Sequence, residues 1–406
     1  MVTNTLLTIS MITQMAARTL VNSLGFSKHV NRNYDSYFAK KGAVIGATLN
    51  MRKPSRYVVT PGAALTIQDT TEQQVSITLN QFHVGASFTS IDKTLSLTDY
   101  NDTVLVPAMA SLANKIDFDG MALGLQCANV VGTPGSPPTS ADAVLAATER
   151  LDYLAAPDDG TRTFVMSPTA NRKIIGGLAN LFNDQGELSK QYKTSRMQSG
   201  LGYNWAMDQN VPTVTVGTGP GGSPVVNTST GITSGSASIT VTGGSGSVTN
   251  AWLAGESVTI AGVYAVNPMN QSSTGQLANF VILSNATTVS GNVTLTVAPT
   301  PVTSGAFQNI TIVSAGASKA VTNLTGTTAG NTYKNSLAFH KDAFVLATAD
   351  LVKPAGNVQS STVVRDGISI RAVEAYDPIN DRAILRFDVL YGWAILFNEL
   401  CVRVTD

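Results

Sequence analysis

A long stretch in the second half of this chain is almost without charge. Residues 218–331 contain two charged residues, Glu256 and Lys319, whereas the whole chain of 406 residues has 26 basic and 26 acidic ones. Within the stretch, valine, isoleucine and leucine recur at every second position in short runs such as SASITVTG, GNVTLTVA and NITI. Alternation with period two predicts strands that bury one face each, and it argues against disorder. We therefore expect a separate all-β module, a small barrel or sandwich, inserted into a parent domain.

The residues on either side of this insert show a different pattern. Before it, Thr139 with Asp142 three positions on predicts a capping box and a helix, and Ser167 followed by Pro168 predicts a second helix start. The run TRTFVMS between them is typical of a buried strand. After the insert, charged residues are interleaved with strong β-formers. The parent domain is therefore predicted to contain an α/β layer, joined to the insert by a hinge-like linker, GTGPGG at 217–222.

The first third of the chain combines a helix, a β excursion and a second helix. Apolar residues at helical spacing predict an amphipathic helix between Leu6 and Leu24. Short β-prone runs separated by Pro54 and Pro61 predict a long two-stranded excursion followed by a core strand. From Thr98 to Gly124 the pattern is helical again, with cap candidates at Asp99 and Asn101 and with Pro107 near the start. One apolar stripe of this predicted helix consists of Leu105, Met109, Leu112, Ile116 and Leu123.

Overall charge and hydropathy limit the possible partners. The formal net charge is zero and only 13% of the residues are charged, so there is no overall field that attracts nucleic acid or an anionic membrane. The first twenty residues carry no basic leader, and no run of about 18 apolar residues occurs, so we expect neither a signal peptide nor a membrane span. Near-zero charge permits a subunit to pack beside copies of itself.

Residues with chemical potential are scattered along the chain. The three histidines, His29, His83 and His340, lie in unrelated segments without a metal-ligand spacing. Cys127 and Cys401 stand in apolar surroundings and are interpreted as buried free thiols. Three aspartate pairs are placed where helix ends and turns favour aspartate anyway; they are Asp117 with Asp119, Asp158 with Asp159, and Asp377 with Asp381. We predict no catalytic, cofactor or metal site, and the chain is not expected to be an enzyme.

The densest basic patch is the only candidate contact site. Arg52, Lys53 and Arg56 lie on the outgoing part of the excursion, and Asp69 and Glu72 follow on the expected returning strand. Binding to phosphate is weakly supported, because the patch is short and has one aromatic neighbour. We interpret these five residues as candidates for ion pairs at a subunit contact, within or between chains.

Five ordered segments resemble one protein family. The first segment runs from GATLNMRKPSRYVV to SLTDY. The other four, in order, are FVMSPTANRKIIGGLANLFN, SGLGYNWAMDQNVPTVTVG, LAFHKDAFVLATADL and LYGWAILFNELCVRV. These segments, with a β insert in the expected place, are similar to the P22-type coat proteins, the major capsid proteins of short-tailed Salmonella phages and their relatives.

The resemblance implies an α+β fold of the HK97-like (Johnson) type with an inserted all-β barrel. Its expected parts are an N-terminal arm at 1–38, an E-loop at 39–80, a P-domain with a spine helix at 81–139, an A-domain at 140–217, the inserted barrel at 218–331, and a return to the A- and P-domains at 332–406.

The resemblance also implies a function and partners. The chain would self-assemble as pentamers and hexamers into an icosahedral virion shell in the bacterial cytoplasm, with a scaffolding protein and a portal protein. The shell would enclose double-stranded DNA without reading its sequence, and it would involve no membrane. The main alternative is an encapsulin-like nanocompartment shell of the same fold. An adhesin would need a secretion signal, and an enzyme would need a convergent polar site.

Overall fold

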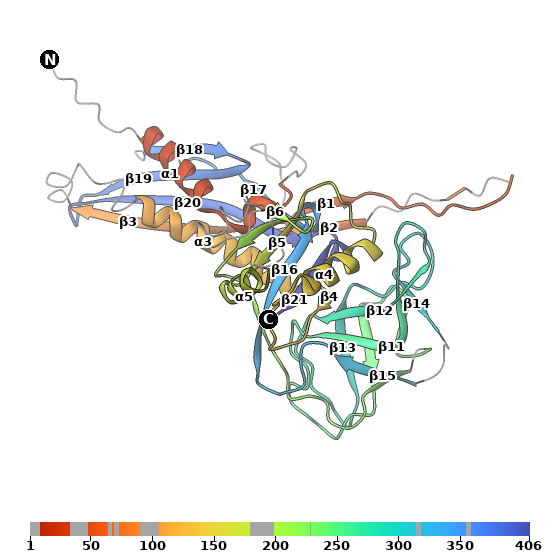
Figure 1. Ribbon diagram of the computed structural model, residues 1–406. Helices are drawn as coiled ribbons and strands as arrows, with labels where there is room; N and C mark the ends of the chain where they lie inside the picture. Colours follow the sequence, from red (N-terminus) through yellow and green to blue (C-terminus); the bar gives the residue numbers. More distant parts are fainter. Residues whose placement is uncertain are drawn as a thin grey trace, which may run out of the picture. The chain divides into compact units, whose positions relative to one another are not determined.

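The computed structural model describes residues 9–32, 48–63, 67–68, 73–89, 105–178, 199–227, 229–313, 318–354 and 359–406. The chain forms two compact units (Figure 1). Unit 1 comprises Met1–Lys53, Gln74–Gly120 and Phe344–Ala394, and unit 2 comprises Pro54–Gln73, Met121–Ala343 and Ile395–Asp406. Each unit is therefore built from segments that are distant in sequence.

Unit 1 is an antiparallel sheet with two helices. The elements are α1 (Ile9–Ser23), η1 (Phe26–His29), β1 (Thr48–Lys53), β2 (Gln73–Thr78), β3 (Asn80–Thr89), α3 (Val106–Ala122), β17 (Phe344–Ala349), β18 (Gln359–Arg365), β19 (Ile368–Asp377) and β20 (Arg382–Ile395). The sheet order is β17-β20-β19-β18, and β3 also pairs with β20. In the register of this sheet, Phe387 of β20 stands between Ala372 of β19 and Val84 of β3.

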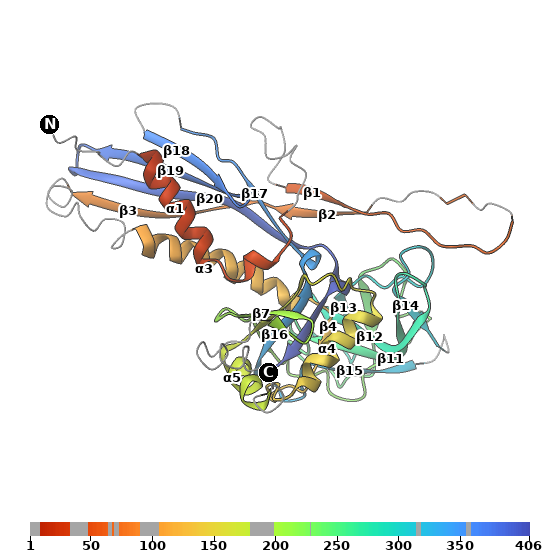
Figure 2. The same cartoon turned by 45° about the horizontal axis from the view of Figure 1, so that its top comes forward.

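One face of this sheet is covered by both helices (Figure 2). Helix α1 packs against β18 and β19 through small side chains such as Ala16 and Ala17. Most of the predicted apolar stripe is buried, since Leu105, directly before α3, and Met109 and Ile116 within it are at most 1% exposed. Pro107 is the second residue of α3, where its missing N–H costs no hydrogen bond. The cap candidates Asp99 and Asn101 lie outside the described residues.

The predicted excursion contains a pair of strands. β1 and β2 form a two-stranded sheet, in which the Ser76 hydroxyl donates to Asn50 over 2.8 Å. The run expected as a single core strand is two strands, because β2 belongs to the excursion and β3 to the main sheet. Gly392 of β20 explains the close approach of these layers, since a Cβ there would lie 2.4 Å from the Thr78 carbonyl oxygen.

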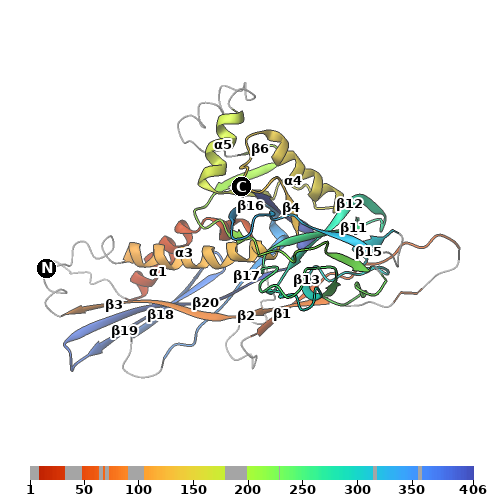
Figure 3. The ribbon, with the colours of Figure 1, turned by 90° about the horizontal axis from the view of Figure 1, so that it is seen from below.

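Unit 2 contains a mixed sheet with helices on one face (Figure 3). Its elements outside the insert are η3 (Leu123–Gln126), β4 (Asn129–Val131), α4 (Ala141–Tyr153), β5 (Arg162–Met166), α5 (Pro168–Leu178), β6 (Ser199–Gly200), β7 (Tyr203–Met207), β8 (Thr213–Thr215), β16 (Thr332–His340), η4 (Lys341–Ala343), η5 (Asn398–Leu400) and β21 (Cys401–Thr405). The strand order is β4-β21-β16-β5-β7-β6, and β8 pairs with the start of β16. Val144 of α4, Ile174 of α5 and Val402 of β21 share one core.

The two predicted helix starts have different outcomes. Ser167 accepts a hydrogen bond from the Ala170 N–H over 3.0 Å, so the Ser-Pro start of α5 is confirmed. The capping box predicted for α4 is wrong, because the residue before the helix is Ser140 and its side chain makes no capping hydrogen bond. The TRTFVMS strand is confirmed as β5, which is buried at all five positions.

The insert is all-β over its described residues. Its strands are β9 (Val225–Asn227), β10 (Ser238–Val241), β11 (Ser257–Val266), β12 (Ser273–Ile282), β13 (Val293–Ala298), β14 (Ile310–Ile312) and β15 (Ser318–Asn323). They pair antiparallel in the order β10-β13-β12-β11-β15-β9, with β14 on β11. A bridge between Val225 and Thr242 joins β9 to the residue after β10. Trp252 and Phe280 lie in a core that the alternating residues supply.

The linker before the insert is hydrogen-bonded to the insert. Thr218 and Gly219 donate backbone hydrogen bonds to the carbonyls of Asn250 and Ala251 over 3.1 and 3.0 Å. The Gly217 N–H donates to the carboxylate of Glu256, one of the two charged residues of the insert. The first residues of this segment are therefore held by hydrogen bonds, and the positive φ of Gly219 places that glycine in a turn.

Candidate assembly surfaces and polar clusters

The predicted contact residues are only partly brought together. Arg52 and Lys53 end β1, and Arg56 forms an ion pair with Glu399, which lies just before β21. Both partners are about a quarter exposed, at 29% and 27%. Asp69 and Glu72 lie outside the described residues. Sequence reasoning missed Glu399, because it is more than 300 positions away from Arg56.

The far part of the excursion exposes apolar side chains. Val59 is 93% exposed, Ile67 84% and Tyr57 60%. The side-chain amide of Gln68 makes two hydrogen bonds to the backbone of Val58. Its oxygen accepts from the Val58 N–H over 2.8 Å, and its nitrogen donates to the Val58 carbonyl. Large apolar side chains that gather on an exposed, extended segment are typical of a contact surface. We call Tyr57, Val59 and Ile67 the apolar tip.

A buried carboxylate holds three strands of unit 1 together. Asp388 of β20 is fully buried and accepts from Arg371 of β19 over 2.7 Å, from Arg386 over 2.7 Å and from Gln81 of β3 over 2.9 Å. Burial by itself would raise the pKa of Asp388, but these hydrogen bonds lower it below its usual value. The sequence signal was a charged residue within the strand RFDVLY, at a position flanked by buried neighbours.

A second carboxylate fixes the turn after α1. Asp117 of α3 accepts from the backbone N–H groups of Gly25 and Ser27, over 2.5 and 2.9 Å, and from the Ser27 hydroxyl. Asp119, its partner in the predicted pair, accepts instead from Tyr391 over 2.7 Å. The two carboxylates therefore serve different contacts, and each has a structural role.

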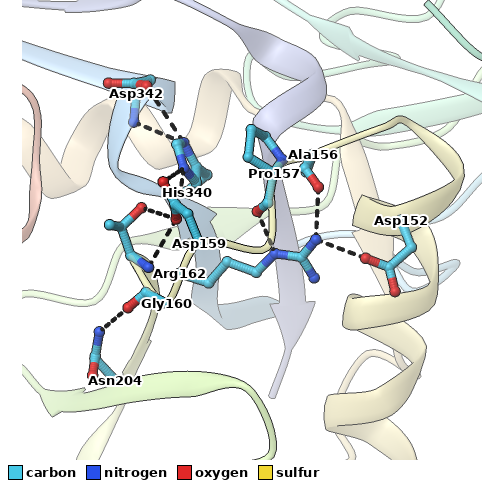
Figure 4. Close-up of polar contacts among 10 residues, drawn as sticks. Asp152, Ala156, Pro157, Asp159, Gly160, Arg162, Asn204, His340 and Asp342 are labelled. Atoms are coloured by element: carbon cyan, nitrogen blue, oxygen red, sulfur yellow. Dashed lines mark hydrogen bonds and ion pairs between the residues drawn. The ribbon is translucent and has the colours of Figure 1, made fainter. Parts of the chain in front are cut away.

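His340 and Asp159 meet at the turn between α4 and β5 (Figure 4). The His340 ring is 2% exposed, and its Nε2 lies 3.3 Å from both oxygens of Asp159. Its Nδ1 accepts from the backbone N–H of Asp342 over 3.2 Å, so the proton of a neutral ring belongs on Nε2. Both ring nitrogens are thus engaged by structural partners, and the ring has no free nitrogen to serve as a general base.

Arg162 completes this polar cluster. Its guanidinium donates to the carbonyls of Pro157 and Ala156 over 2.9 and 2.7 Å and to Asp152 over 2.7 Å (Figure 4). His340 and Arg162 are neighbours in the register of β16 and β5. Together they fix the loop at 156–161, which explains why a buried histidine and a buried arginine occur in this sheet.

The Thr161→Val variant is expected to raise the pKa of Asp159. Hydrogen bonds from the Thr161 hydroxyl and backbone N–H, with a smaller contribution from His340, lower this pKa to about 2. Because the folded-state pKa is lowered, the stabilising effect of Asp159 is present above its ordinary pKa of about 4 and is lost as the pH falls toward 2. A carbon-13 titration of the Asp159 carboxylate measures the shift. Thr161→Ser keeps the hydroxyl and should leave the pKa low, whereas an unchanged pKa in Thr161→Val contradicts the assignment.

The two cysteines are free and fully buried, as predicted, and they lie together. Burial, and then the neighbouring thiol of Cys127, raise the pKa of Cys401 well above its usual value. Among the residues that the structure describes, no group of three or more His, Cys, Asp or Glu side chains is placed to bind a metal ion. No described helix is long and apolar enough to span a membrane.

Solved capsid structures are similar to this chain at low identity. A structure from Mycobacterium phage Che8 is 12% identical, with a TM-score of 0.46 and coverage of 93% of this chain and 90% of that chain. The capsid of an empty GTA particle is 7% identical, with a TM-score of 0.44 and coverage of 94% and 90%. The mature capsid of bacteriophage PhiM1 is 10% identical, with a TM-score of 0.41 and coverage of 88% and 82%. No curated protein sequence matches the chain.

The match to a protein-family model identifies the family of this chain, which structural similarities at such low identity and TM-score do not. The model of the P22 coat protein, gene protein 5, matches residues 1–402, nearly the whole chain. The mixed α+β content, the strand-rich sheets and the excursion are compatible with that match. The chain therefore belongs to the P22 coat protein family and is a major capsid protein, a structural protein of a bacteriophage shell.

Proposed function

We propose that this coat protein forms pentamers and hexamers that close into an icosahedral head, and that the apolar tip of each excursion docks on a neighbouring copy. The observation that carries the proposal is the family match over residues 1–402. The exposure of Val59 and Ile67 in the single chain supports it, since such side chains gain free energy when a partner covers them.

The domain scheme of the HK97-like fold applies to this chain as part of the proposal. The arm (1–38), the E-loop (39–80) outside Pro54–Gln73, and the P-domain with spine helix α3 (81–139) correspond mainly to unit 1. The A-domain (140–217), the insert (218–331) and part of the return (332–406) correspond mainly to unit 2. We infer that the insert is a closed β-barrel, because the bridge between Val225 and Thr242 links the two end strands of its sheet.

Assembly then depends on many weak contacts. Each excursion adds a small apolar contact, and in a closed shell every contact after the first is effectively intramolecular. Arg52, Lys53 and Arg56 lie at the base of the apolar tip, and we propose that they orient the excursion, with Asp69 and Glu72 contributing charge of the opposite sign. The ion pair between Arg56 and Glu399 within the chain supports this role for Arg56.

Further partners follow from the family rather than from any single contact. We propose that a scaffolding protein directs assembly in the bacterial cytoplasm, that a portal protein occupies one vertex, and that the finished head encloses double-stranded DNA. The formal net charge of zero agrees with enclosure of DNA without sequence-specific binding.

Electron microscopy of the expressed full-length chain tests the proposal. With the adjacent scaffolding gene coexpressed, we expect closed icosahedral shells, and without that gene we expect fewer and less regular particles. Shells that form regularly without scaffold and package an enzyme with a cargo peptide would instead identify a nanocompartment. A discrete monomer under both conditions would refute shell assembly.

A further inference from the structure

Two arginines of the parent domain are buried against the insert. Arg403 of β21 is fully buried, and Arg150 of α4 is 7% exposed. Within unit 2, Arg403 lies between Val402 and Val404, which face the helices, so its side chain leaves the opposite face of the sheet. There it donates to the Gly255 carbonyl, just before β11, over 2.7 Å and to the hydroxyl of Ser257, the first residue of β11.

Arg150 reaches a second strand of the insert. Its guanidinium donates to the side-chain oxygen of Gln276 over 2.9 Å and to the carbonyl of Leu277 over 3.0 Å, both in β12. Its Nε donates to Asn129 of β4 over 3.1 Å. One guanidinium thus connects α4 and β4 of the parent domain to β12 of the insert.

Neutral groups supply all of these acceptors. Among the described residues, no aspartate or glutamate pairs with Arg150 or Arg403. Burial lowers the pKa of each to about 10, so both stay charged at neutral pH. A buried charge without a counter-ion is costly when its donors are left without acceptors, and the rigid fork of donors in a guanidinium fits few arrangements of acceptors. Once these arginines are buried, their hydrogen bonds therefore favour the one orientation of the insert that satisfies them.

The remaining contacts are also polar and specific. The Ser257 hydroxyl donates to the Ala128 carbonyl over 3.3 Å, and the side-chain amide of Asn279 lies within hydrogen-bond distance of the Val130 backbone. The two chain crossings are bonded to each other, since the Gly330 N–H donates to the Val216 carbonyl over 2.9 Å. The insert is therefore held at several separated points, including both crossings.

We propose that Arg150 and Arg403 are positioning residues that lock the insert onto the parent sheet, so that insert and A-domain move as one body. The sequence had predicted a hinge at 217–222, which would let the insert pivot. A locked insert instead passes the displacement caused by any contact on its surface directly to α4 and β21. This inference concerns the single chain and does not depend on shell assembly.

Limited proteolysis of the unassembled full-length chain tests the lock. In the double variant Arg150→Met, Arg403→Met, proteinase K is expected to cut at both crossings, near 217–222 and 324–331, and to release a resistant fragment. Cleavage should be at least about ten times faster than in the wild type, since losing a buried hydrogen bond from a charged donor changes an equilibrium by about that factor or more. Wild-type resistance at both crossings in the double variant would overturn the proposal.

Arg162→Met is the matched control. Arg162 is also a buried arginine, at 3% exposed, but its partners Asp152, Ala156 and Pro157 all lie in the parent domain. This variant should be cleaved near the loop at 156–161 without releasing the insert. Release of the same fragment from Arg162→Met would mean that general destabilisation opens the crossings, and it would also overturn the proposal.

If proteinase K degrades the whole chain of the double arginine variant, a milder pair of substitutions still tests the proposal. Ser257→Ala and Gln276→Ala together remove one acceptor from each arginine and leave both arginines in place. We expect the same fragment at an intermediate rate, with hydrogen exchange in the cores of β11 and β13 unchanged. Cleavage at the wild-type rate, or loss of protection in those cores, would contradict the lock.

Discussion

Replacing Val59 and Ile67 by aspartate is expected to abolish shell formation while the chain stays folded. Both side chains are almost fully exposed in the single chain, so the carboxylates cost little there. At a subunit contact, each substitution removes about 1.5–3 kcal/mol of apolar burial and places a charge in a site without a partner. Because a shell repeats every contact many times, small losses are multiplied. Sedimentation and electron microscopy after coexpression with scaffold measure the result.

Met269→Asp provides the matched control for this experiment. Met269 is 80% exposed on the loop between β11 and β12, so the substitution makes a similar change at a similar exposure outside the excursion. We expect Met269→Asp to assemble. Circular dichroism of the unassembled chains must show equal folding in all variants. Normal shells from the Val59 and Ile67 variant would refute the docking role of the apolar tip.

Asp388→Ala is expected to destabilise unit 1 by about 3 kcal/mol, the lower part of the range for breaking a buried ion pair. The substitution leaves Arg371, at 15% exposure, without its carboxylate partner, and it removes the acceptor shared by β19, β20 and β3. Asp388→Asn keeps the shape and one acceptor oxygen, so a loss of about 1–2 kcal/mol is expected. Urea unfolding of the unassembled chain, followed by circular dichroism, measures both values.

The stability that the Asp388 carboxylate contributes is expected to depend on pH. Since the folded-state pKa of Asp388 is lowered, its contribution is fully present above the ordinary pKa of about 4 and is lost as the pH falls below it. The difference in stability between wild type and Asp388→Asn should therefore shrink between pH 5 and the acid limit. Asp377→Asn is the control, because its partner Arg382 is nearly half exposed and the pair is screened by water. Equal effects from both variants would contradict the role of burial.

Several elements were predictable because their signals are local. The period-two runs predicted the strands of the insert, and the stripe through Leu105, Met109 and Ile116 predicted α3. The Ser167-Pro168 start was correct because a cap involves residues only three positions apart. The α4 cap failed for a related reason. Thr139 and Asp142 match the pattern, but the helix begins at Ala141, and the pattern does not fix the first turn.

The polar clusters could not be predicted in the same way. Asp388 meets Arg371 and Gln81, Arg56 meets Glu399, and Cys127 meets Cys401, and in each case residues from separate segments come together. The two cysteines lie far apart in the sequence, and no local pattern indicates that they meet. Strand order determines these neighbours, and strand order is a property of the whole sheet.

By itself the sequence indicated a mixed α+β chain, a charge-poor stretch rich in strands, the main helices and, through ordered resemblance, the coat protein family. These features depend on hydrophobic period, turn residues and composition, which act over a few residues or over whole segments. The tertiary structure alone decided that the start of the glycine-rich linker is hydrogen-bonded to the insert and that Arg150 and Arg403 donate hydrogen bonds to the insert. Such contacts arise only when distant strands pair, because a hydrogen bond depends on position in space and not on separation along the chain.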